Sequence, residues 1–145
     1  MQDYTTMFFI VASFVGPVLF WFIIILIISR IGGWNKIAER FSYTGFTGET
    51  SDKKRYQSIK MGMSNYSGIV HFQALSQGLQ MSVMFLFRPG HGDILIPWQE
   101  LQAEENKGIL HNMYKFSFMS LPGRYFYTYK ILGEWILEKK KEYVA

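Results

Sequence analysis

The sequence predicts an α+β protein: a single N-terminal transmembrane helix, then a small antiparallel β barrel or sandwich, then a C-terminal helix. Three observations lead to this prediction. Residues 7–28 contain no charged side chain, the middle of the chain alternates short apolar runs with turns rich in Gly and Pro, and residues 124–142 repeat apolar side chains at helical spacing. A chain of 145 residues has room for one domain beside the apolar helix.

Residues 7–28 predict a transmembrane helix that follows a short external tail, residues 1–6. A helix of this length rises about 33 Å, more than the roughly 30 Å of a hydrocarbon core. Trp21 is unusual inside such a span, because Trp prefers the membrane interface. Ala12 and Gly16 form a small-xxx-small pair that permits close helix packing. The alternatives are a lipid-facing anchor and a helix that binds a partner in the membrane through Ala12, Gly16 and Trp21.

The charge distribution predicts the topology. All 15 Lys and Arg residues follow residue 29, whereas residues 1–6 carry only Asp3. Positive residues stay on the cytoplasmic side, so we expect the N-terminus outside and the domain, residues 42–145, in the cytoplasm. A cleaved signal peptide is the competing interpretation. It is disfavoured because the basic n-region is missing, the apolar run is too long, and residues 28–30 make a poor cleavage site.

Residues 29–41 predict a short amphipathic helix, separated from the anchor by two glycines. Its apolar side chains recur at i, i+3, i+4 and i+7 from Trp34. The helix either lies at the membrane interface or caps the core of the domain, and the pattern fits both. Basic residues near a bilayer attract anionic lipid, by about 1 kcal/mol each at the surface. The residues that we predict at a membrane surface are Trp34, Lys36 and Arg40 in this helix, and Lys53, Lys54 and Arg55 in the following loop.

Short strands are predicted after this loop, because apolar runs of five to nine residues alternate with turn residues. The segment 99–106 is polar and fits a single helical turn. The predicted strands are residues 55–63, 67–75, 79–87 and 93–98, followed by one long or two short strands within 109–121.

The turn RPGHG, residues 88–92, gives the most clearly predicted hairpin. We expect Trp98 to anchor this hairpin in the core. Arg88 and His91 are the polar residues of the turn best suited to contact a partner. An ion pair between Arg88 and Asp93 across the turn is the simpler alternative for the arginine.

No motif in the sequence predicts catalysis, a metal or a cofactor. The chain has no cysteine, which excludes disulfides, thiolate metal sites and a cysteine nucleophile. His71, His91 and His111 are spaced by twenty residues, unlike the close pairs of metal ligands. The net charge of +4 is small and no nucleic-acid-binding module is recognisable, so nucleic acid is not an expected partner.

The segment 78–101, GLQMSVMFLFRPGHGDILIPWQEL, resembles a group of small uncharacterised bacterial membrane-anchored proteins. The shared features are a Gly-Leu strand, the motif Phe-Arg-x-x-His, and an apolar strand that ends in Ile-Pro-Trp before an acidic residue. Gly92-Asp93 departs from the two prolines of that group. The matching residues are Gly78, Leu79, Phe87, Arg88, His91, Ile96, Pro97, Trp98 and Glu100, with Gly33-Trp34 and Ile37-Ala38 upstream.

The same segment is more distantly similar to bacterial pleckstrin-homology (PH) or GRAM domains. That resemblance implies a small antiparallel barrel or sandwich closed by a C-terminal helix, and it implies no activity. The expected function is therefore a non-enzymatic accessory or scaffolding subunit, docked on a larger complex of the bacterial inner membrane. The alternative is a free membrane-anchored PH-like module that binds anionic lipid headgroups or a cytoplasmic peptide.

Overall fold

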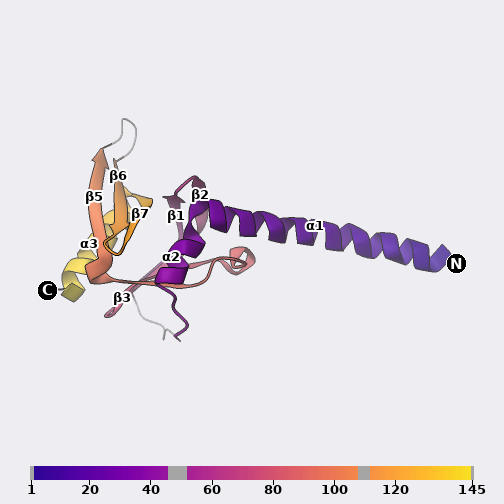
Figure 1. Cartoon of the computed structure of the whole chain (residues 1–145), viewed down its shortest axis with the longest axis horizontal. Coiled ribbons are helices and arrows are strands. Elements are labelled where there is room, and N and C mark those ends of the chain that lie inside the picture. Colours follow the sequence, from indigo (N-terminus) through magenta and orange to yellow (C-terminus); the bar gives the residue numbers. More distant parts are fainter. Residues whose placement is uncertain (1, 46–51, 108–111, 145) are drawn as a thin grey trace.

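A computed structural model describes residues 2–45, 52–107 and 112–144 of the chain. A long helix projects from a domain made of one sheet and two further helices (Figure 1). Two short 3-10 helices, η1 and η2, flank strand β4. In chain order the elements are α1 (Gln2–Gly32), α2 (Trp34–Arg40), β1 (Lys53–Met61), β2 (Ser64–Leu75), β3 (Gly78–Val83), η1 (Phe85–Phe87), β4 (Ile94–Pro97), η2 (Trp98–Glu100), β5 (Leu101–Lys107), β6 (Asn112–Phe118), β7 (Leu121–Tyr129) and α3 (Lys130–Val144).

Helix α1 is longer than the predicted span and continues unbroken through Pro17. By length and composition it is able to cross a membrane. Its side chains are exposed from Asp3 to Ile23, whereas Ile25 and Ser29 are fully buried against the domain. The helix ends at Gly32 because Gly33 adopts the left-handed region, with φ of 83°, as the paired glycines predict. The final two turns of α1 therefore belong to the folded domain.

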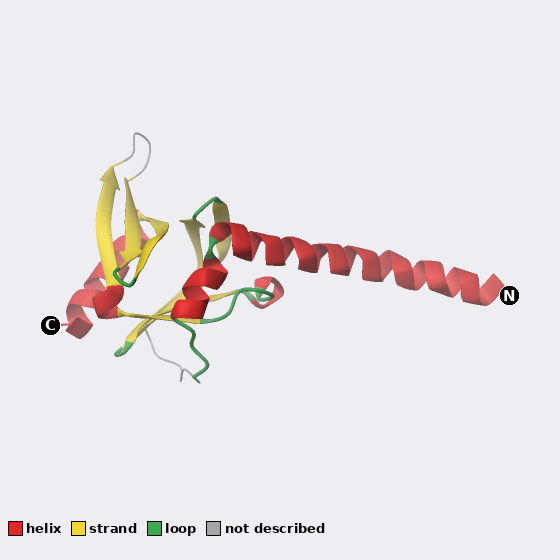
Figure 2. Cartoon of the chain, in the orientation of Figure 1, coloured by secondary structure: helices red, strands yellow, loops and turns green. Residues whose placement is uncertain are grey.

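The seven strands, which are yellow in Figure 2, form one antiparallel sheet in the order β4-β3-β2-β1-β7-β6-β5. The prediction of an α+β chain with antiparallel strands is confirmed, with seven strands where five or six were expected. The two edge strands, β4 and β5, are separated in sequence only by the three residues of η2. The end of β4 and the start of β5 therefore lie close together, which curls the sheet. No ladder joins the two edges in the part of the chain that the structure describes, so the sheet is open there rather than a closed barrel.

The hairpin of β3 and β4 is confirmed, with Leu79 opposite Ile96 and Met81 opposite Ile94. The predicted strand 79–87 is too long, because β3 ends at Val83 and η1 follows. The first hairpin turns two residues earlier than predicted, at residues 62–63.

Two predictions for the C-terminal half are wrong. Residues 124–129 form the end of β7 rather than the start of the last helix, which begins at Lys130. Phe126 and Tyr129 fit helical spacing, but Phe126 and Thr128 also alternate as the buried face of a strand. The segment 99–106 contains the last two residues of η2 and then most of strand β5, so it does not form the separate helical turn that was predicted. The polar composition of β5 suits an edge strand.

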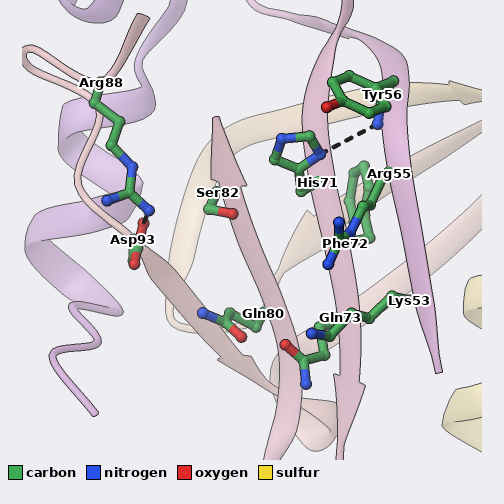
Figure 3. A pocket seen from close by; sticks show the side chains of 10 residues that line it. All are labelled: Lys53, Arg55, Tyr56, His71, Phe72, Gln73, Gln80, Ser82, Arg88 and Asp93. Carbon is green, nitrogen blue, oxygen red and sulfur yellow. Dashed lines mark hydrogen bonds and ion pairs between the residues drawn. The ribbon is translucent and has the colours of Figure 1, made fainter. Parts of the chain in front are cut away.

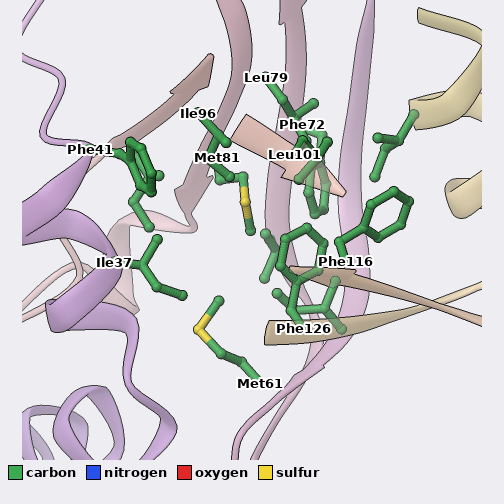
Figure 4. Close-up of a cluster of buried hydrophobic side chains, with 14 of the residues drawn as sticks. Ile37, Phe41, Met61, Phe72, Leu79, Met81, Ile96, Leu101, Phe116 and Phe126 are labelled. Atoms are coloured by element: carbon green, nitrogen blue, oxygen red, sulfur yellow. The ribbon is translucent and has the colours of Figure 1, made fainter. Parts of the chain in front are cut away.

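The core lies between the curled sheet and helices α2 and α3 (Figure 4). Phe116 stacks on Phe126 with ring centroids 5.3 Å apart, and Phe72 lies 6.4 Å from Phe126. Helix α2 buries Trp34 and Ile37 completely in the same cluster. Of the two alternatives for this helix, the cap on the core is the one observed. Trp34 is therefore not a membrane-surface residue, because its indole faces the interior.

Candidate functional site

A polar cleft of about 240 Å³ lies on the face of the β1–β2–β3 sheet opposite the core (Figure 3). Strand pairing builds its floor, since His71 lies opposite Ser82 and Gln73 opposite Gln80. The intervening residues of the same strands, among them Phe72 and Met81, point into the core. The lining residues are Lys53, Arg55, Tyr56, His71, Phe72, Gln73, Gln80, Ser82, Arg88 and Asp93.

An irregularity in β1 shapes one side of the cleft. The register of β1 against β2 shifts between Lys54 and Gln57, and Tyr56 has a φ of 53°. This backbone lets the N–H of Tyr56 donate to His71 Nδ1 at 3.2 Å, while the two rings meet edge to face at 4.9 Å. A non-glycine residue in the left-handed region is uncommon, and such residues often occur at functional sites.

The cleft is positively charged. Lys53, Arg55 and Arg88 line it, against the single carboxylate of Asp93. Arg88 Nη2 lies 3.8 Å from Asp93 Oδ1, which confirms the predicted ion pair across the turn. Burial lowers the pKa of His71, and the positive charges of Arg55 and Arg88 lower it further. Burial is the larger cause of this shift, and the smaller contribution of the two arginines reflects the positive charge at this end of the cleft, which favours an anion.

Gln80 places a further polar group in this cleft. Its side chain is more than nine-tenths buried, and its Oε1 has no hydrogen-bond partner within the described ranges. Buried side-chain amides are normally paired. With Gln73 and Ser82, Gln80 gives the cleft a polar floor beside cationic side chains, an arrangement that suits an anion bearing hydroxyl groups.

A second polar cluster joins α1 and α2 to the loop of residues 84–93. Three side chains of the helices donate to carbonyl groups of this loop. Trp21 Nε1 donates to Leu86 O at 3.3 Å, Ser29 Oγ donates to Gly90 O, and Trp34 Nε1 donates to Gly92 O at 2.8 Å. Three hydrogen bonds thus attach the loop to the helices, at Leu86, Gly90 and Gly92.

His91 lies inside this junction rather than in an exposed turn, so the prediction that it contacts a partner from the turn is wrong. Its Nδ1 is 3.0 Å from Pro89 O, and its Nε2 is 2.9 Å from the hydroxyl of Tyr66. A carbonyl only accepts, so Nδ1 carries the proton and Tyr66 donates to Nε2. Burial lowers the pKa of His91 and raises the pKa of Tyr66, which keeps both groups neutral.

Only some of the predicted site residues lie together in the polar cleft. Lys53, Arg55 and Arg88 meet at the cleft, and Lys53–Arg55 lie in β1 rather than in a loop. Lys54 is not part of the lining. The remaining predicted residues lie elsewhere: Lys36 is 3.5 Å from Glu39, Arg40 covers the ring of Phe41 at 5.3 Å, and Ala12 and Gly16 are exposed on α1.

Sequence reasoning missed Tyr56, His71, Gln73, Gln80 and Ser82 as lining residues. The available signal was the alternation of polar residues at 71 and 73 and at 80 and 82, within two strands whose presence, though not their exact bounds, was predicted. His111 lies outside the described residues. Among the residues that are described, no group of three His, Asp or Glu side chains is placed to hold a metal ion.

Comparison with models of known protein families and with curated protein sequences finds no match to this chain.

Proposed function

We propose that this protein is a non-enzymatic, single-pass protein of the bacterial inner membrane whose cytoplasmic PH-like domain binds an anionic lipid headgroup. The observation that supports this most directly is the convergence of Lys53, Arg55 and Arg88 on one cleft with a single carboxylate. Guanidinium groups recognise phosphate through charge-assisted hydrogen bonds, and the floor of the cleft adds polar side chains for the hydroxyls of a headgroup.

The retained anchor is supported by the packing of α1. Ile25 and Ser29 are buried in the domain, Ser29 donates to Gly90 O, and Ser64 donates to Ile28 O at 3.3 Å. Cleavage of the apolar helix as a signal sequence would remove part of this packing. With Lys and Arg confined to the domain side, the N-terminus lies outside. Protease added to intact spheroplasts should leave the domain uncut, and digestion there would contradict the topology.

The PH/GRAM-like assignment is supported by the order of the elements. Seven antiparallel strands are followed directly by α3, and η2 joins the two edge strands so that the sheet curls. A lipid headgroup is a more fitting ligand than a peptide, because the cleft is small and its lining is polar. Arg88 also comes directly after η1, which adjoins α1.

Native mass spectrometry of the full chain in neutral detergent tests this proposal. Phosphatidylglycerol should remain bound, whereas phosphatidylcholine should not. The double variant Arg55→Gln with Arg88→Gln should weaken phosphatidylglycerol binding by about tenfold or more, because each charge-assisted hydrogen bond contributes about 1.5–3 kcal/mol.

The matched control is Lys60→Gln with Lys130→Gln. It removes the same charge from two exposed positions away from the cleft, one of them in the same strand β1. The control should retain binding. Equal loss in both double variants would mean that net charge alone attracts the lipid and that the cleft is not a site.

Docking on a larger membrane complex is the second candidate function. Ile23, Ile27 and Ile31 recur every four residues on one face of α1, and each is about half exposed beside the domain. An exposed apolar stripe of this kind fits a protein partner. Gly16 also has open space around it, so the helix surface there permits close approach.

Gentle extraction of the full chain, followed by identification of co-purifying proteins, tests this candidate. Ile27→Ser with Ile31→Ser should release the partner complex and leave membrane attachment intact. Replacement of residues 7–28 by a poly-Leu span should also release it if Ala12, Gly16 and Trp21 contact the partner. Retention of the complex by both variants would rule out docking through α1.

A further inference from the structure

The 3-10 helix η1 displays two apolar side chains that the domain does not cover. Phe85 is 80% exposed and Leu86 is 60% exposed. Both lie at the tip of the loop of residues 84–93, which extends alongside the C-terminal part of α1 (Figure 1). Their neighbour Phe87 instead turns inward, and packs against the core cluster.

The position of this tip along α1 is set by named contacts. Trp21 donates to Leu86 O, and the rings of Trp21 and Phe87 lie 5.2 Å apart. Two turns further along the helix, Ser29 donates to Gly90 O. A side chain at Gly90 would collide with this helix, since an added Cβ would lie 2.9 Å from Leu26 Cδ2. Phe85 and Leu86 are therefore held at the level of Trp21.

The exposure of α1 changes close to the same level. Every described side chain up to Ile23 is exposed, whereas Ile25 is buried in the domain. The uncharged segment from Tyr4 to Ile23 rises about 30 Å, which matches the thickness of a hydrocarbon core without help from the residues that follow.

We propose that η1 inserts Phe85 and Leu86 into the cytoplasmic interface of the bilayer, and that the hydrocarbon core ends near residues 21–23 rather than at residue 28. This inference rests on the membrane anchor of the proposed function. The lipid surface is the fitting occupant because the apolar tip is continuous with the exposed, apolar part of α1.

The backbone of the loop decides between shallow and deep insertion. Irregular backbone exposed to lipid does not occur within the hydrocarbon region, because its N–H and C=O groups would lack partners. Arg88 follows the tip directly and is charged. Both features place the loop at the interface, where aromatic side chains are favoured. Trp21 then lies at the cytoplasmic edge of the hydrocarbon core, next to the interface, which explains a tryptophan that is otherwise unusual within an apolar span.

The proposed end of the hydrocarbon core also places the polar cleft relative to the membrane. Arg88 comes one residue after η1 and lines the cleft. With Phe85 and Leu86 at the interface, Arg88 lies at the level of the lipid phosphates. The inserted tip thus orients the cleft toward headgroups of the same membrane that holds the anchor.

Site-directed spin labelling of the full chain in lipid nanodiscs tests this inference. The chain has no cysteine, so single-cysteine variants label at one position each. The labelled variants are Phe85→Cys and Leu86→Cys at the tip, Phe14→Cys within the span, Ile27→Cys beyond the proposed boundary, and Met119→Cys as the matched control. Met119 is an exposed apolar residue in the turn between β6 and β7. Relaxation by oxygen, relative to a water-soluble nickel chelate, reports the depth of each label.

We expect the label at position 14 to be deep, the labels at 85 and 86 to be at interfacial depth, and those at 27 and 119 to be accessible to the nickel chelate. Full aqueous exposure at 85 and 86 with a deep label at 14 would overturn the insertion and leave the anchor intact. A deep label at 27 would overturn the boundary. Aqueous exposure at 14 would instead contradict the anchor itself, and with it the proposed function.

Discussion

Trp21 Nε1 lies 3.3 Å from the carbonyl oxygen of Leu86 and donates a hydrogen bond to it, across 65 positions of sequence. This contact attaches the exposed part of α1 to the domain. Together with Ser29 to Gly90 and Trp34 to Gly92, it fixes the direction in which the long helix leaves the sheet. Two of these three contacts come from α1 and the third from α2, which follows it directly, so α1 acts as a rigid extension of the domain rather than as a flexible tether.

Trp21→Phe should loosen this attachment without unfolding the domain. The substitution keeps an aromatic ring against Phe87 and removes the donor to Leu86, a loss of about 0.5–1.5 kcal/mol. Amide exchange in residues 84–88 should accelerate in the variant. Phe20→Leu, at an exposed neighbouring position, is the control and should leave exchange unchanged. Identical protection in Trp21→Phe and wild type would show that the hydrogen bond does not hold the loop.

His91 should make the stability of the protein depend on pH. Burial lowers its pKa in the folded state, whereas the unfolded chain has the ordinary value of about 6.5. Between these two values the unfolded state binds more protons, so the free energy of unfolding rises with pH and falls on acidification. His71 has a lowered pKa as well and contributes with the same sign.

Denaturant titrations at about pH 7.5 and about pH 5.5 check this dependence, in the range where histidine titrates. His91→Phe should be less stable at the higher pH, because Tyr66 loses its acceptor, yet it should lose less stability on acidification than wild type. Adding His71→Gln should reduce the remaining loss. An unchanged acid-dependent loss in the double variant would contradict the assignment of neutral, buried histidine.

Trp98 should be a major determinant of stability. It is almost fully buried, its Nε1 donates to Leu75 O at 2.8 Å, and its ring stacks on Tyr143 with centroids 5.9 Å apart. Trp98→Ala should lower the free energy of unfolding by about 3–5 kcal/mol. Trp98→Phe, which keeps an aromatic ring and removes the donor, should cost less. Unchanged melting of the alanine variant would argue for a binding role instead.

Gly133 should not tolerate alanine, although alanine favours helices by about 1 kcal/mol over glycine. An added Cβ would lie 2.3 Å from Tyr114 Cδ2 and 2.9 Å from Thr128 Oγ1. Relief of this overlap requires α3 to move away from β6 and β7, at a cost of about 1–3 kcal/mol. Glu134→Ala, the exposed neighbour, should change the unfolding free energy by less than about 0.5 kcal/mol. A Gly133→Ala variant more stable than wild type would contradict the close packing of α3.

Local sequence patterns predict the elements whose signals are strong and short-ranged. The uncharged run ending at residue 28 and the Pro-Gly turn before Asp93 each specify one structure. Phe126 and Tyr129 do not, because aromatic residues at these positions suit either a strand or a helix. Pairing with β1 and β6 decides in favour of the strand, and that pairing involves distant residues.

The lining of the cleft is harder to predict from the sequence, because tertiary structure brings its residues together from distant segments. Arg55 and Arg88 are identifiable as exposed cations, but the bulge in β1 and the loop after η1 bring them to one cleft. The alternation of His71 with Gln73 is visible in the sequence, yet it is also the ordinary pattern of a solvated strand face. The hydrogen bond from Trp21 to Leu86 joins residues 65 positions apart, so no local sequence pattern predicts this pair.

The His71 side chain offers the most direct test of anion binding in the cleft. Its imidazole signals can be followed by NMR across pH in the detergent-solubilised full chain, with glycerol 3-phosphate or with chloride at matched ionic strength. Burial, Arg55 and Arg88 hold its pKa below the ordinary value in the free protein. A bound anion should raise it in wild type, and should have little effect in the Arg55→Gln, Arg88→Gln variant. A His71 pKa that glycerol 3-phosphate leaves unmoved in wild type would contradict the cleft as an anion site.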